Sequence, residues 1–199
     1  MKYFLALILI AVSAQTFAAE RVPGVIVYAN GPVNVTFLIP TGIFGGGPNT
    51  EAMQKRVRYI DPKGKKRWLK PDQAKEFSFT LEGQRFRMVS KTYLHSLFSS
   101  TVFLLQLIDG PVKMFEHRVT TSGTSGVNGM GSMPSTTINY LLQRGDEPLN
   151  EPNVFGFKKE MAKYFADCPA LVALIEEKEF KRRDIGEIVL FYNNRCKGS

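Results

Sequence analysis

The sequence predicts an α+β fold: an antiparallel β-sheet or partly closed barrel, followed by a C-terminal segment of three short helices. Two patterns indicate this fold. Between Gly24 and about Leu142, apolar residues alternate with mostly polar ones in short stretches separated by turn sequences, as in half-buried antiparallel strands. After Pro152, apolar residues recur every three or four positions, which is typical of helices buried on one face. The chain is therefore divided into a signal peptide at 1–18, a β-rich domain at 19–150 and a C-terminal helical segment at 151–199.

Short turn sequences mark the hairpins of the predicted sheet. Asn30-Gly31, Glu82-Gly83 and Asp109-Gly110 each separate two β-prone stretches, and pairs of this kind favour tight hairpins. Asp61-Pro62-Lys63-Gly64 carries proline and glycine at the positions that a type I turn favours. The predicted strands cover residues 25–28, 33–39, 56–60, 65–69, 77–81, 86–90, 101–108, 112–119 and 138–143.

Two stretches are predicted to be loops. Residues 40–49 contain four glycines and two prolines, which interrupt both strands and helices. Residues 120–137 carry no charge and consist largely of glycine, serine and threonine, a composition typical of a mobile loop.

Three helices are predicted after Pro152. Pro169 suits the first turn of the second helix, and Asp184 with Glu187 resembles a capping box at the start of the third. The apolar faces consist of Phe157, Met161, Tyr164 and Phe165 in the first helix, Leu171, Val172, Leu174 and Ile175 in the second, and Ile185, Ile188, Val189 and Tyr192 in the third.

The first residues have the three parts of a signal peptide. Lys2 supplies the positive charge, residues 3–12 form a run that is apolar apart from one tyrosine hydroxyl, and Thr16-Phe17-Ala18 fits the small-x-small cleavage rule. The alternative is a membrane anchor, which requires roughly 20 apolar residues. We therefore predict cleavage after Ala18, with Ala14 and Ala19 as alternative sites. The mature protein is expected in the periplasm or the extracellular space, without a transmembrane span.

The charge of the chain predicts the kind of partner. The formal net charge is +8 and the pI is about 9.5. Because Lys2 is the only charged residue of the signal peptide, its removal leaves +7. Such an excess of positive charge attracts anionic partners. For an exported protein, we expect these to be an anionic glycan, a lipid head group or an envelope protein rather than nucleic acid.

Cys168 and Cys196 are the only cysteines, and export permits their oxidation. Cys168 lies at the start of the second predicted helix and Cys196 at the end of the third, so antiparallel pairing of these helices brings them together. We expect a disulfide, with two separate buried thiols as the alternative. Two cysteines and two distant histidines are too few ligands for a metal site, and we expect neither metal nor cofactor.

No catalytic motif stands out in the sequence. His95 and His117 have no neighbouring cysteine, aspartate or serine pattern of a catalytic site, and the serines around His95 lie outside a Gly-x-Ser-x-Gly elbow. Gly45-Gly46-Gly47 lacks the Gly-Lys-Ser/Thr of a phosphate-binding loop. A hydrolase with a site near His95 or His117 is the alternative to a binding protein.

The strongest functional signal is a basic hairpin. Eight lysines and arginines occur within residues 55–70, interleaved with Tyr59 and Trp68. Alternate strand residues share a face, so this face is expected to hold phosphate or carboxylate groups while Trp68 stacks on a sugar ring. The alternative is a solvated edge hairpin whose lysines block pairing with other chains. On the expected face, Arg56 and Arg58 lie beside Lys65 and Arg67. The predicted binding residues are Arg56, Arg58, Lys65, Lys66, Arg67 and Trp68.

Several segments give the chain a family resemblance. These segments are Gly24-x-Ile26, Trp68-Leu69-Lys70-Pro71-Asp72, Phe103-Leu104-x-x-Leu107-x-Asp109-Gly110, Tyr164-Phe165-Ala166-Asp167-Cys168-Pro169 and Phe191-Tyr192-Asn193-x-x-Cys196. In spacing and character, over nearly the whole mature chain, the sequence resembles small secreted proteins of unknown function common in Bacteroidota-type bacteria. The resemblance implies a sheet-rich body, a helical tail and an envelope location, but no activity. The chain departs from the group at Gly31-Pro32, where an acidic Gly-Asp turn is usual, and in the uncharged loop.

These observations together predict an exported envelope protein. We expect it to bind an anionic envelope component or a protein partner without catalysing a reaction.

Overall fold

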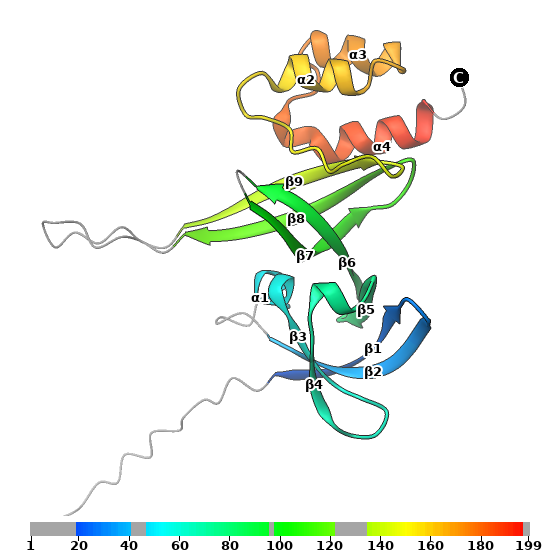
Figure 1. The fold of residues 1–199 in the computed structure, drawn as a ribbon. Coiled ribbons are helices and arrows are strands. Elements are labelled where there is room, and N and C mark those ends of the chain that lie inside the picture. The colour runs from blue at the N-terminus through cyan, green and yellow to red at the C-terminus, as the bar shows by residue number, and fades with distance from the viewer. Residues whose placement is uncertain (1–18, 41–46, 96–97, 122–134, 197–199) are drawn as a thin grey trace, which may run out of the picture.

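The computed structural model describes residues 19–40, 47–95, 98–121 and 135–196. These residues form one antiparallel sheet in the order β4-β3-β2-β1-β5-β6-β7-β8-β9, and most of the helices follow it at the C-terminal end (Figure 1). The strands are β1 Glu20–Tyr28, β2 Gly31–Ile39, β3 Val57–Ile60, β4 Lys66–Leu69, β5 Glu76–Leu81, β6 Gln84–His95, β7 Phe98–Ile108, β8 Val112–Thr121 and β9 Ser135–Arg144. The α-helices are α1 Thr50–Lys55, α2 Phe157–Tyr164, α3 Pro169–Glu176 and α4 Ile185–Arg195, with short 3₁₀ turns at Pro71–Gln73 and Arg182–Asp184.

The predicted α+β class is confirmed, with an antiparallel sheet followed by helices. The sheet is not closed, because β4 and β9 lie at its two edges, so the alternative of a partly closed barrel is wrong. The described residues contain four α-helices rather than three, since α1 forms where the sequence pattern predicts no helix. None of these described helices has the length and apolar character needed to cross a lipid bilayer.

Three predicted segments lie wholly or largely outside the described residues. They are the signal peptide at 1–18, the loop at 40–49 and the loop at 120–137. At both ends of the last loop, the described residues correct the predicted bounds. β8 continues to Thr121 and β9 begins at Ser135, and the hydroxyls of the paired residues Thr120 and Thr136 lie 2.7 Å apart. Threonine is β-branched and packs well in strands, which explains why the ladder extends into this stretch.

The sheet divides where β7 and β8 separate. The two strands pair only from Leu105 opposite Glu116 to Ile108 opposite Met114, with a register shift between Gln106 and Ile108. Beyond Glu116, the ladder of β8 continues with β9 alone. Helix α1 lies against the edge of β8 that this separation opens, and its side chains replace the missing ladder hydrogen bonds.

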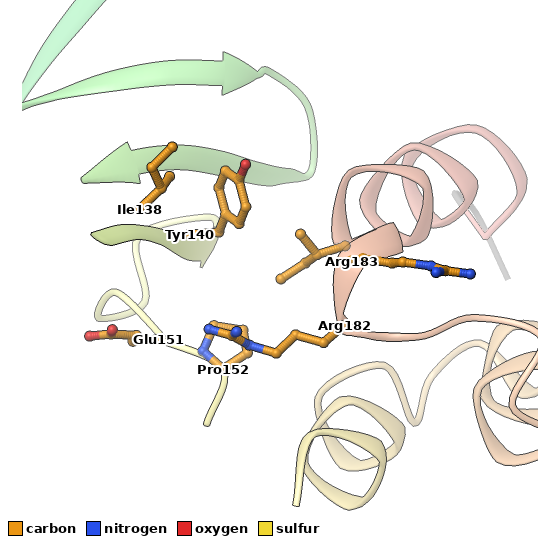
Figure 2. Close-up of a pocket in the computed structure, with 7 residues that line it drawn as sticks. Ile138, Tyr140, Glu151, Pro152, Arg182 and Arg183 are labelled. Atoms are coloured by element: carbon orange, nitrogen blue, oxygen red, sulfur yellow. The ribbon is translucent and has the colours of Figure 1, made fainter. Parts of the chain in front are cut away.

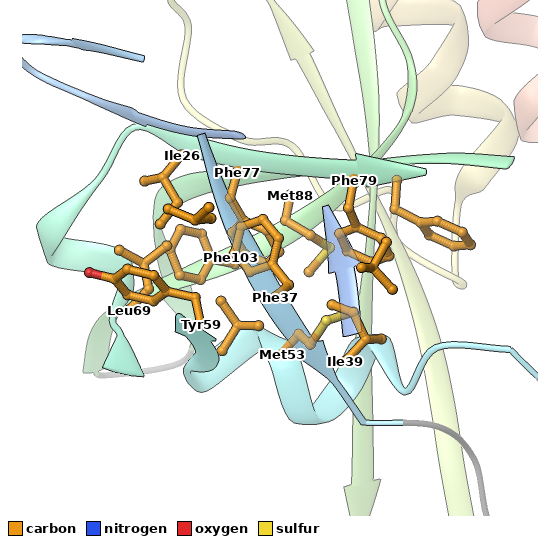
Figure 3. Packing of buried hydrophobic residues seen from close by; sticks show 14 of the residues in the cluster. Ile26, Phe37, Ile39, Met53, Tyr59, Leu69, Phe77, Phe79, Met88 and Phe103 are labelled. Carbon is orange, nitrogen blue, oxygen red and sulfur yellow. The ribbon is translucent and has the colours of Figure 1, made fainter. Parts of the chain in front are cut away.

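The inner face of β1 to β7 carries an aromatic core (Figure 3). The ring centroid of Phe77 lies 5.1 Å from that of Phe37 and 4.8 Å from that of Phe103. Met53 of α1 is fully buried in the same cluster, so this short helix belongs to the core. Strand β1 passes close to Phe37, because a Cβ atom added at Gly24 would lie 2.7 Å from its ring. Only glycine fits at this point of β1.

Helix α4 lies against β8, and α2 and α3 lie on the far side of α4 from the sheet (Figure 1). Their apolar residues form one buried cluster with residues of β8 and β9, and each fully buried apolar side chain stabilises the fold by roughly 1.5–3 kcal/mol. The buried residues of this second core include Val112, Met114 and Leu142 from the strands and Phe165, Leu171 and Ile188 from the helical segment.

Polar contacts and a disulfide fasten the helical segment to the sheet. The guanidinium of Arg144 in β9 donates hydrogen bonds to both carboxylate oxygens of Asp167, at 2.6 and 3.1 Å. The hydroxyl of Tyr192 in α4 also donates to Asp167, and the Arg144 guanidinium lies 4.8 Å from the centroid of the Tyr192 ring. The predicted bridge between Cys168 and Cys196 is confirmed, and it joins the start of α3 to the end of α4.

Candidate binding surface on the β3–β4 hairpin

The predicted turn at Asp61–Gly64 forms between β3 and β4. The Gly64 N–H donates to the Asp61 carbonyl oxygen at 2.8 Å, and Gly64 has a φ of +78°, which glycine adopts without strain. One carboxylate oxygen of Asp61 accepts the N–H groups of Lys63 and Lys65 at 3.0 and 2.9 Å. The other binds Arg67 Nε at 2.6 Å. The Arg67 guanidinium, together with these backbone donors, lowers the pKa of the Asp61 carboxyl. Arg67 is thus already occupied by an ion pair.

The strand register separates the basic residues onto two faces. Arg58 pairs with Trp68, whereas Tyr59 pairs with Arg67 and is buried in the core. The predicted placement of Arg56 and Arg58 beside Lys65 and Arg67 is therefore wrong. That placement assumes a loop of four residues, but the ladder begins at Ile60 opposite Lys66 and leaves five residues in the loop. A shift of one residue exchanges the two faces of a strand.

Trp68 is the centre of the exposed face. Its side chain is 43% exposed, and the Cζ atoms of Arg56 and Arg58 lie 4.3 and 4.6 Å from the centroid of its ring. Guanidinium groups over an indole ring are attracted by its electron-rich face, so Trp68 orients both cations. We call the exposed residues Arg56, Arg58, Lys66 and Trp68 the Trp68 surface. Of the predicted binding residues, Lys65 lies in the turn, and Arg67 lies opposite Tyr59 in the register with its side chain 53% exposed.

Two cavities adjoin the Trp68 ring. The larger, of about 420 Å³, is lined by basic side chains and by an apolar wall that includes Leu38, Pro40 and Ala52. The smaller, of about 180 Å³, is lined by Trp68, Arg58, Lys66 and Arg67, and it lies at the edge strand β4. The lining residues of the larger cavity are Ala19, Leu38, Pro40, Ala52, Lys55, Arg56, Arg58 and Trp68.

The apolar wall of the larger cavity was not among the predicted site residues. Leu38 of β2 lies opposite Arg58 in the register, and Ala52 belongs to the unpredicted helix α1. One signal for this wall is present in the sequence. In the alternating stretch 33–39, the apolar Leu38 occupies a position where an outward-facing polar residue is expected.

The cations of the Trp68 surface have no anionic partner within the described part of the chain. No carboxylate there forms an ion pair with Arg56, Arg58 or Lys66, whereas Arg87 and Arg144 both bind carboxylates. A guanidinium can bind phosphate or carboxylate through two parallel hydrogen bonds. The surface therefore offers two oriented guanidinium groups, with an apolar wall beside them, to an external anion.

The two histidines lie on different strands. His95 is the last residue of β6, where its backbone pairs with Phe98, and the prediction about its side chain falls outside the described residues. His117 in β8 packs its ring edge-on against Tyr93, with 5.2 Å between the ring centroids. The Tyr93 hydroxyl in turn donates to the Glu151 carboxylate at 2.8 Å. Over the described ranges, no three or more histidine, cysteine, aspartate or glutamate residues gather as in a metal site.

A further cavity of about 180 Å³ lies between β9 and the start of α4 (Figure 2). Arg182 extends toward Pro152 in this cavity, whereas the guanidinium of Arg183 points away from it, as Figure 2 shows. Glu151 also lines the cavity. Opposite charges are thus both present here, so the Trp68 surface is the better candidate for an anionic ligand.

Comparison with known proteins gave no match to a family model, a curated protein or a solved structure. The resemblance to small secreted proteins therefore stays a prediction, and function is argued from the site alone.

Proposed function

We propose that the protein is an exported envelope protein that binds an anionic envelope component through the Trp68 surface, without catalysing a reaction. The observation that carries this proposal is the pair of guanidinium groups of Arg56 and Arg58, both held over one exposed ring and both without a carboxylate partner in the described chain. The ordering of long arginine side chains costs conformational entropy when a ligand binds. Because Trp68 already orients them, less entropy remains to be lost.

The residues that line the larger cavity indicate which class of ligand it can bind. Three cationic side chains contribute to it, so a phosphate or carboxylate group is favoured. Leu38, Pro40 and Ala52 form an apolar wall, which favours a ligand whose anionic group is attached to a sugar ring or an acyl chain. An anionic glycan and an anionic lipid head group share this chemistry, and experiment distinguishes them.

Export supports this choice of ligand. The segment 1–18 has the pattern of a signal peptide, and the Cys168–Cys196 disulfide is of the kind that forms in oxidising compartments. In those compartments the abundant polyanions are glycans and lipids.

Maturation adds a cation to the same cavity. Ala19 lines the larger cavity of the Trp68 surface. Cleavage after Ala18 makes Ala19 the first residue and gives it an α-amino group, whose ordinary pKa is about 7.7–8.0. The mature protein then presents an ammonium group beside Lys55, Arg56 and Arg58, whereas the uncleaved chain has an uncharged peptide bond at this place.

The test compares two variants that change the net charge equally. The first carries Arg56→Glu and Arg58→Glu. The control carries Lys75→Glu and Arg85→Glu, at exposed positions outside the cavities of the Trp68 surface. The probes are heparin oligosaccharides, as a soluble anionic glycan, and short-chain phosphatidylglycerol below its micelle concentration, as a single lipid.

We expect the wild-type protein and the control to bind at least one probe, and the first variant to lose roughly tenfold or more in affinity, as for the loss of hydrogen bonds to charged groups. Preference for heparin assigns a glycan, and preference for the lipid assigns a head group with its chain. Equal weakening in both variants would mean that only net charge matters. The absence of wild-type binding to both probes would reject the proposed function.

A further inference from the structure

The loop before α2 displays two apolar side chains to solvent. Phe155 is 90% exposed and its neighbour Val154 is 58% exposed, which makes them the most exposed large apolar residues among those described. Phe157, only two positions later, is buried in the second core. The two phenylalanines of this short segment therefore have opposite environments.

The backbone of this loop is fixed in a way that presents Phe155. The Asn153 side-chain oxygen accepts the N–H of Phe155 at 3.0 Å, and the N–H of Asn153 donates to the Glu160 carboxylate at 2.7 Å. Pro152 is buried on one side of the loop and Phe157 on the other. Residues 153–156 are thus held at both ends, with the two apolar side chains projecting between them.

Two lysines follow this loop closely in the sequence. Lys158 and Lys159 are exposed in the first turn of α2. The N-terminal end of a helix favours acidic residues, so these lysines do not serve the stability of α2. Among the described residues, no carboxylate forms an ion pair with either lysine, and the Glu160 carboxylate is engaged by Asn153.

We propose that this loop is a membrane-binding tip: Phe155 and Val154 enter the interface of an anionic lipid bilayer, while Lys158 and Lys159 bind its phosphate groups. A projecting apolar tip beside cations suits a bilayer, whose surface combines negative charge with accessible acyl chains. A protein partner would need a pocket shaped for the tip, and charge complementarity selects an anionic surface. Lipid contact of this kind is peripheral and does not require a spanning segment.

The tip is separate from the Trp68 surface. Figure 1 shows α2 at one end of the molecule and the β3–β4 hairpin at the other. The inference is therefore independent of the proposed function and can fail or succeed without it.

The experiment measures partition of the protein onto vesicles of phosphatidylglycerol and phosphatidylcholine by sedimentation. Burial of a phenylalanine side chain is equivalent to a factor of roughly 10–100 in partition, so Phe155→Ala is expected to reduce binding by at least about tenfold. Lys158→Glu with Lys159→Glu should also reduce it, and more strongly at low salt. Leu190→Ala is the matched control, because Leu190 is an exposed apolar residue, 47% exposed, that belongs to a different helix, α4.

The single tryptophan of the chain allows a second readout by fluorescence, and a variant that fails to fold would not give the same result. Trp68 belongs to β4, which lies at the other end of the molecule from α2 in Figure 1, so insertion of the tip should leave its emission unchanged. A change in Trp68 emission on vesicles would instead report lipid at the Trp68 surface. In a Trp68→Phe background, Phe155→Trp should restore an emission signal that shifts to shorter wavelength on vesicles. Equal partition of Phe155→Ala and wild type would overturn the inference. So would equal losses in Phe155→Ala and Leu190→Ala, or no vesicle binding by the wild-type protein.

Discussion

The side-chain amide of Gln54 forms two hydrogen bonds with the backbone of Arg118, 64 positions away in the sequence. Gln54 Oε1 accepts the N–H of Arg118 at 2.7 Å, and Gln54 Nε2 donates to the carbonyl oxygen of Arg118 at 2.8 Å. The amide thereby takes the place of a strand neighbour where β8 has left β7. Because the Gln54 side chain is buried, the two backbone groups have no access to bulk water as a substitute.

Substitution of Gln54 by alanine should therefore destabilise the fold. It leaves a backbone donor and an acceptor of Arg118 unpaired, and we expect the free energy of unfolding to fall by about 1–3 kcal/mol. Urea denaturation followed by circular dichroism measures this change. Gln84→Ala, at the exposed first position of β6, is the control and should leave the midpoint nearly unchanged. Similar stability of both variants would show that α1 is not needed at the edge of β8.

The disulfide should contribute strongly to the stability of the helical segment. Cys168 and Cys196 are separated by 28 positions, and in the chain-entropy model a loop of this size corresponds to about 3.5 kcal/mol. We expect Cys168→Ala with Cys196→Ala to lower the unfolding free energy by up to this amount. The same drop should follow treatment of the wild-type protein with reductant, while the double variant should not respond to reductant. A wild-type protein indifferent to reductant would contradict this role.

Asp167 should make stability sensitive to acid. The Arg144 guanidinium, with the Tyr192 hydroxyl as a further donor, lowers the pKa of the Asp167 carboxyl from 3.8 to about 2. Because the folded pKa lies below the unfolded one, this group stabilises the folded state above about pH 4, and the contribution is lost as the pH falls toward about 2. The thermal midpoint of Asp167→Asn should thus fall less over this range than that of the wild-type protein. Parallel curves for the two proteins would contradict the assignment.

The charge of the N-terminus should affect ligand binding. A chain that begins at a free Ala19 presents an ammonium group at the larger cavity, whereas an acetylated chain of the same length does not. We expect acetylation to weaken heparin binding severalfold at low salt and less at high salt, as for a partly exposed charge. Equal binding by the two chains would remove Ala19 from the site and leave the role of Arg56 and Arg58 untouched.

Local features of the sequence were sufficient to predict most of the elements. The turns at Asn30-Gly31 and Asp61–Gly64 depend on residues a few positions apart, and the structure has both hairpins. The third helix of the C-terminal segment is likewise visible in the spacing of Ile185, Ile188 and Tyr192. Helix α1 was missed because six residues are too few to show a helical period, and it gains stability from Met53 in the core.

The geometry of the site depends on which strands pair and in which register, and local sequence patterns do not determine either. A loop of five residues instead of four placed Arg67 opposite Tyr59 and brought Arg58 opposite Trp68. The apolar wall at Leu38 exists because β2 pairs with β3, which is a non-local contact. The residue types of the basic hairpin could thus be selected from the sequence, but their division between two faces required the register.

The most direct test of the proposed binding surface is the emission of Trp68 during titration with heparin oligosaccharides. Trp68 is the only tryptophan and carries both guanidinium groups over its ring, so a ligand that binds Arg56 and Arg58 must alter its surroundings. We expect a saturable change in emission whose midpoint moves to higher ligand concentration as salt is added. Heparin binding measured by calorimetry without any change in Trp68 emission would contradict the account.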